Sequence, residues 1–98
     1  MATITIRRQG ESGPVYFDPS SIKLGAGDFV IWVNEDPRES HHPTMDGQPA
    51  DYWMNYPLPP AVPDEPAASS PQINLAGPDP IRYVDALDSD VEAGTITF

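Results

Sequence analysis

The chain has 98 residues, which is enough for one domain and too few for two. Its 5 Lys and Arg residues face 15 Asp and Glu residues, a formal net charge of −10, so the backbone of a nucleic acid and an anionic membrane surface are excluded as natural partners. No Cys is present, which excludes disulfides, thiolate catalysis, iron–sulfur clusters and zinc fingers.

Short strand patterns alternate with turns rich in Gly and Pro along much of the chain. The strongest strand is expected at 29–33, where Phe, Val, Ile and Trp follow one another, so both of its faces should be covered. The predicted strands are 3–6, 15–17, 22–24, 29–33, 72–75, 81–84 and 95–98. About seven short strands without a convincing helix predict an all-β fold, either a β-sandwich or a small barrel.

The middle of the chain lacks this alternation. Eight of the 13 prolines fall between Pro57 and Pro80. Because proline cannot donate to a sheet ladder and disrupts a helix, the segment 57–71 is expected to be a proline-rich arm or a crossover loop. Three aromatic residues, Tyr52, Trp53 and Tyr56, come just before it, and they are expected to form either a lid over the core or an exposed platform for a partner.

Several segments of the chain follow one another in a distinctive order and spacing. A Gly-Asp turn at 27–28 leads into the strand 30–34, which contains Trp and ends in Asn, and His41 follows soon after. The sequence Tyr-Val-Asp-Ala-Leu-Asp occupies 83–88, and Gly-Thr-Ile-Thr-Phe occupies 94–98. In this order and spacing, the chain resembles the cupredoxin family, the small blue copper proteins.

The resemblance implies a cupredoxin-like Greek-key β-sandwich that forms a single domain over residues 1–98, with 57–71 as its long proline-rich connection. It also implies an exported, periplasm-like setting. The chain as given opens directly on a strand pattern without an export signal, which instead predicts a cytoplasmic protein if this is the native start.

The family binds copper through one His of the middle loop and through Cys, His and Met of the last loop. The last three positions hold Asp85, Asp88 and Glu92 here, and the first is His41 or its neighbour His42. A blue copper site needs a thiolate, so no blue copper is expected. Mixed imidazole and carboxylate ligands suit one divalent Cu, Zn or Mn ion. The sequence thus leaves two hypotheses for these five residues, a non-blue metal site or a solvated acidic loop.

Adjacent residues on a strand point to opposite faces, so one of His41 and His42 is expected to face the site and the other to face solvent. An alternative function is a metal-free interaction or accessory module, in which Tyr52, Trp53 and Tyr56 and the acidic tip meet a basic or apolar protein partner. No nucleophile motif or other catalytic signature is present, so an enzyme is not expected.

Overall fold

The computed structural model describes residues 2–98, and its regular structure consists of strands alone. The strands are β1 (Ala2–Arg8), β2 (Val15–Asp18), β3 (Ser21–Lys23), β4 (Phe29–Asn34), β5 (Pro43–Met45), β6 (Ala68–Ser69), β7 (Ile73–Asn74), β8 (Ile81–Asp85) and β9 (Gly94–Thr97). The all-β prediction is therefore confirmed. Over residues 2–98, the structure has no helix of the length and apolarity that a membrane span requires.

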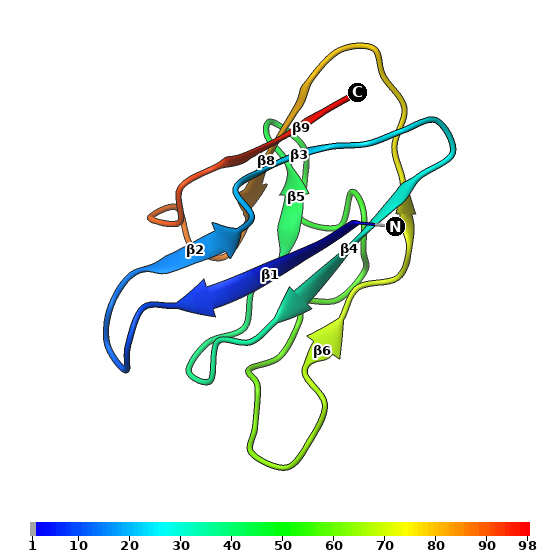
Figure 1. The fold of residues 1–98 in the computed structure, drawn as a ribbon. Helices are drawn as coiled ribbons and strands as arrows, with labels where there is room; N and C mark the ends of the chain where they lie inside the picture. The colour runs from blue at the N-terminus through cyan, green and yellow to red at the C-terminus, as the bar shows by residue number, and fades with distance from the viewer. Residues whose placement is uncertain (1) are drawn as a thin grey trace.

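Two mixed sheets pack together as a β-sandwich (Figure 1). The first sheet has the order β2-β1-β4-β6, and β7 also pairs with β4. The second sheet has the order β3-β9-β8-β5. Strand β1 runs parallel to β4 and β3 runs parallel to β9, while the other pairs are antiparallel.

Strand β4 is the centre of the first sheet, as its sequence predicts. Its residues alternate with period two, so Val30, Trp32 and Asn34 are buried while the residues between them are half-buried. It pairs with β1 on one side and with β6 and β7 on the other. A strand with neighbours on both sides that is buried on one face and half-buried on the other tolerates the apolar run that identifies it in the sequence.

Aromatic rings fill the core between the sheets. Trp32 of β4 stacks on Trp53 with ring centroids 4.9 Å apart, and it meets Tyr83 of β8 edge-on at 5.6 Å. Phe17 of β2 packs edge-on against the same tyrosine at 4.8 Å. Because Trp53 belongs to the irregular segment before the prolines, part of that segment is a lid over the core.

Strands β5 and β6 were not expected from the sequence. Strand β5 has three residues and begins with Pro43, but it lies at a sheet edge, where proline is tolerated. The chain then crosses from β5 in the second sheet to β6 in the first, and of the segment 57–71 the residues 57–67 lie in this crossover while 68–69 form β6. Backbone hydrogen bonds between His41 and Leu58 fix the crossover, with N···O distances of 3.0 and 2.7 Å.

We expect Gly94→Ala to destabilise the protein because β9 packs tightly on Tyr83. A Cβ atom at Gly94 would lie 2.1 Å from Cζ of the buried tyrosine ring, so the ring or the strand would have to move. The free energy of unfolding should fall by about 1–3 kcal/mol in urea titrations. The control is Gly25→Ala, whose Cβ would meet only Asp28 Oδ2 at 3.4 Å. Equal unfolding midpoints for the two variants would contradict this packing.

Candidate functional site

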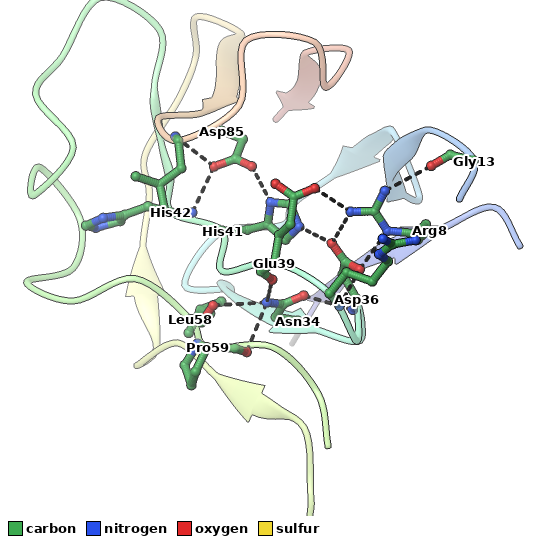
Figure 2. Close-up of polar contacts among 12 residues, drawn as sticks. Arg8, Gly13, Asn34, Asp36, Glu39, His41, His42, Leu58, Pro59 and Asp85 are labelled. Carbon is green, nitrogen blue, oxygen red and sulfur yellow. Dashed lines mark hydrogen bonds and ion pairs between the residues drawn. The ribbon is translucent and has the colours of Figure 1, made fainter. Parts of the chain in front are cut away.

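Four ionisable side chains form a continuous series of ion pairs at one end of the sandwich (Figure 2). We call Arg8, Asp36, His41 and Asp85 the charged cluster. Asp36 and His41 are fully buried, Asp85 is buried, and the side chain of Arg8 is nine-tenths buried. Charges at this depth are stable only when they compensate one another.

The strand pairing explains why these four residues meet. Strands β1 and β4 are parallel and in register at Ile6 and Asn34, so Arg8 at the end of β1 comes close to the turn that follows β4. Strands β5 and β8 are antiparallel with Pro43 opposite Asp85, so the residues just before β5 meet the end of β8. The cluster thus joins both sheets at one end.

Asp36 accepts hydrogen bonds from three groups. Arg8 binds it through both carboxylate oxygens, with Nε 2.8 Å from Oδ1 and Nη2 2.9 Å from Oδ2. The backbone N–H of Arg38 donates to Oδ1 at 3.0 Å, and Nε2 of His41 lies 2.6 Å from Oδ2. Burial opposes ionisation of Asp36, but these hydrogen bonds outweigh it and lower the pKa of its carboxyl to about 2.

His41 lies between two carboxylates. Its Nε2 faces Asp36 and its Nδ1 faces Oδ2 of Asp85. Burial favours the neutral ring, but hydrogen bonds to Asp85 and then to Asp36 outweigh it and raise the pKa of His41. Only the protonated imidazolium can donate from both nitrogens. In that state the cluster has two cations and two carboxylates and is neutral as a whole.

The cluster also fixes the loops around it. The second oxygen of Asp85 accepts the backbone N–H groups of His42 at 2.9 Å and Leu87 at 3.1 Å. Beside the cluster, buried Asn34 accepts the N–H of Asp36 through Oδ1 at 2.9 Å. Its Nδ2 lies within hydrogen-bond distance of three carbonyl oxygens, those of Glu39, Leu58 and Pro59. Asn34 therefore connects the cluster to the crossover.

Of the five residues that the sequence suggested as metal ligands, the structure brings His41 and Asp85 into direct contact. The ring of His42 points away from the cluster (Figure 2). Its Nε2 lies 2.8 Å from the carbonyl oxygen of Met54. Asp88 accepts the N–H of Asp90, Glu92 is exposed, and neither carboxylate contacts a histidine among residues 2–98.

The expectation that one histidine of the pair faces solvent is wrong. His42 is buried, because the segment around Met54 folds over it and provides its hydrogen-bond acceptor. Strand alternation puts the two rings on opposite sides of the chain, and the covering segment buries the ring that alternation alone would leave in solvent.

These donors do not fit a metal ion as they are arranged. No group of three or more His, Asp or Glu side chains that could hold an ion is found over residues 2–98. An ion would need a free nitrogen lone pair from His41, and both ring nitrogens already face carboxylates. No protein-family model matches the chain.

An apolar groove of about 320 Å³ lies beside the cluster. It is bounded by the segment 54–59 on one side and by β6 and Pro71 on the other. Of the residues that line it, Met54 and Leu58 are buried, whereas Tyr56 is 79% exposed. The nearby Tyr52 is 48% exposed, so the two tyrosines of this segment face solvent while Trp53 covers the core.

The chain around the groove is acidic. Residues 39–81 contain no Lys or Arg. Their carboxylates are Glu39, Asp46, Asp51, Asp64, Glu65 and Asp79. Glu39 and Asp46 are paired with Arg8 and Arg82, and Asp79 lies in the β7–β8 segment at the other end of the sandwich, so the unpaired negative charge in the segments that adjoin the groove comes from Asp51, Asp64 and Glu65.

We expect Asp85→Ala to lower the free energy of unfolding by about 3–5 kcal/mol, because it leaves buried His41 without one of its two carboxylates. Asp88→Ala, three residues along the same loop, should cost less than about 1 kcal/mol, because Asp88 only accepts a local N–H. Urea denaturation of both variants measures the difference. Similar losses for the two variants would show that Asp85 has no special role in stability.

Stability should pass through a maximum between about pH 4 and pH 6.5. The depressed pKa of Asp36 contributes stability above its unfolded value of about 3.9, and this contribution is lost as the pH falls toward 2. The raised pKa of His41 contributes stability below its unfolded value of about 6.5, and this contribution is lost as the pH rises through the folded value. Urea midpoints at several pH values measure both limbs. The alkaline decline should be absent in His41→Gln, and its persistence there would assign it to other groups.

Proposed function

We propose that this chain is a cupredoxin-like Greek-key β-sandwich that lacks a blue copper site and works as a metal-free interaction module. The two packed mixed sheets and the meeting of His41 with Asp85 support the first part of this proposal. The groove beside the cluster supports the second part.

The charged cluster and the neighbouring Asn34 together give the groove a rigid base. Asn34 and His41 bind the backbone of Leu58 and Pro59, which form part of the groove wall. The wall on the other side is β6, which pairs with the end of β4. A groove that is ordered before binding costs little conformational entropy when a partner enters it.

The proposed occupant is an extended, basic segment of a partner protein with one apolar side chain. The observation that carries this proposal is the exposed ring of Tyr56 over an apolar groove, in a stretch of 43 residues (39–81) without a single cation. The apolar side chain would enter the groove, and Lys or Arg residues of the partner would face the carboxylates around it. An Arg of the partner could also stack on Tyr56.

The competing proposal is a divalent ion bound by His41 or His42 with Asp85, Asp88 and Glu92. It has less support, because His41 would have to give up one of its carboxylates and the loop that carries Asp88 and Glu92 would have to turn inward. Calorimetric titration with Zn²⁺, Cu²⁺ and Mn²⁺ tests it. Saturable binding of one ion that is lost in Asp88→Ala would favour the ion.

The interaction proposal is tested with synthetic peptides and ¹⁵N-labelled protein. The probe is a seven-residue peptide that combines Arg and Pro with one central Leu, and its matched control has Glu in place of every Arg. We expect the basic peptide alone to shift the amide resonances of Tyr56, Leu58 and Ser69. Its affinity should fall as the salt concentration rises, because the attraction to exposed carboxylates is screened.

Tyr56→Ala should weaken binding of the basic peptide about tenfold, the scale of one well-placed aromatic contact at an interface. The matched control is Tyr16→Ala, since Tyr16 is also exposed but lies on β2 at the other edge of the first sheet. Neither variant removes a buried ring, so both should fold. Equal affinities of the two variants, or equal binding of the basic and acidic peptides, would contradict the proposal.

A further inference from the structure

A second and larger cavity lies at the other end of the sandwich. The charged cluster is at the ends of β1, β4 and β8, whereas this cavity is near the starts of β4 and β8. Figure 1 shows the turn between β3 and β4, the segment between β7 and β8 and the C-terminus together at this end. The cavity has a volume of about 640 Å³, within the range of small-molecule sites.

The walls of the cavity are apolar and held in place by backbone contacts. Leu24, Leu75 and Phe98 provide the largest apolar side chains, and Leu24 donates its N–H to Thr97 at 2.8 Å. Phe98 packs directly on Gly77, where a Cβ atom would lie only 2.6 Å from the Cβ and Cγ atoms of the phenylalanine. Glycine at this position therefore lets the ring form a wall without closing the cavity.

Two kinds of donor at the cavity, a lysine and backbone N–H groups, have no partner within residues 2–98. Lys23 is the only lysine of the chain, and it makes no ion pair within residues 2–98. The backbone N–H groups of Leu75, Ala76 and Gly77 make no hydrogen bond with that part of the chain either. Asp28, the acidic residue of the neighbouring turn, accepts the N–H of Gly25 at 3.0 Å.

We propose that this cavity binds a small carboxylate with an apolar body, such as a medium-chain fatty acid or an aryl acid. The apolar body lies against Leu24, Leu75 and Phe98. The carboxylate faces the ammonium group of Lys23 and the free N–H groups of Ala76 and Gly77. A neutral apolar molecule would leave these donors unused, and a cation would be repelled by Lys23.

The probe is octanoate, compared with octanol and octylammonium, which carry the same chain on a neutral and a cationic head. Calorimetry and ¹⁵N spectra of the whole chain measure the affinity and the site. We expect octanoate to bind most tightly and to shift the amides of Leu24, Ala76 and Gly77, octanol to bind more weakly at the same amides, and octylammonium not to bind.

Lys23→Gln should weaken the binding of octanoate about tenfold and leave the affinity for octanol unchanged. The substitution removes a charge-assisted contact and keeps the apolar walls. Arg82→Gln is the control, since Arg82 is an exposed cation on β8. Ala26→Trp should abolish binding of both ligands by filling the cavity from its exposed rim. Unchanged octanoate affinity in Lys23→Gln, or amide shifts confined to other regions, would overturn the proposal. The groove at the opposite end is not involved, so this result is independent of the proposed interaction function.

Discussion

The balance of buried charge among Arg8, Asp36, His41 and Asp85 is the constraint on which the rest of the structure depends. Moving an ion from water into a protein interior costs several kcal/mol, so each member of the series needs an oppositely charged neighbour. The neighbours come from both sheets and from the turn after β4. The ion pairs that neutralise these charges therefore also hold the two sheets together at one end of the sandwich. The loops after β4 and β8 are bound to the same carboxylates, and their paths follow from this arrangement.

The two ends of the sandwich have different chemistry. At one end, polar side chains are satisfied inside the protein, and the surface around them is acidic with an apolar groove. At the other end, the walls are apolar, and Lys23 and the N–H groups of Leu75, Ala76 and Gly77 have no partner within residues 2–98. The paired strands of the two sheets run between the two ends, so the groove and the larger cavity share no lining residue. A chain of 98 residues thus has two separate concave surfaces of different chemistry.

The sequence predicts the regular part of the fold well because its signals are local. The apolar run at 29–33 marks β4, and the terminal alternation marks β9, since both depend on residues close together in the chain. Strands β5 and β6 are too short to show a period, and pairing with a distant strand defines them. The family resemblance placed His41 and Asp85 at one site, but Arg8 and Asp36 carried no signal as partners. Their contact depends on the register of β1 against β4, which no local pattern encodes.

The short strands at the margins of both sheets also affect the tendency of the protein to aggregate at high concentration. The outermost strands are β2, β6 and β7 in one sheet and β3 and β5 in the other, and none of them exceeds four residues. A foreign strand that approached a margin would find few free backbone groups in a row, and at β5 it would also meet a proline. Growth into stacked fibrils is therefore disfavoured by geometry as well as by a net charge of −10. The sheet margins are therefore poor sites for association through backbone pairing, in contrast to the side chains and cavities of the surface.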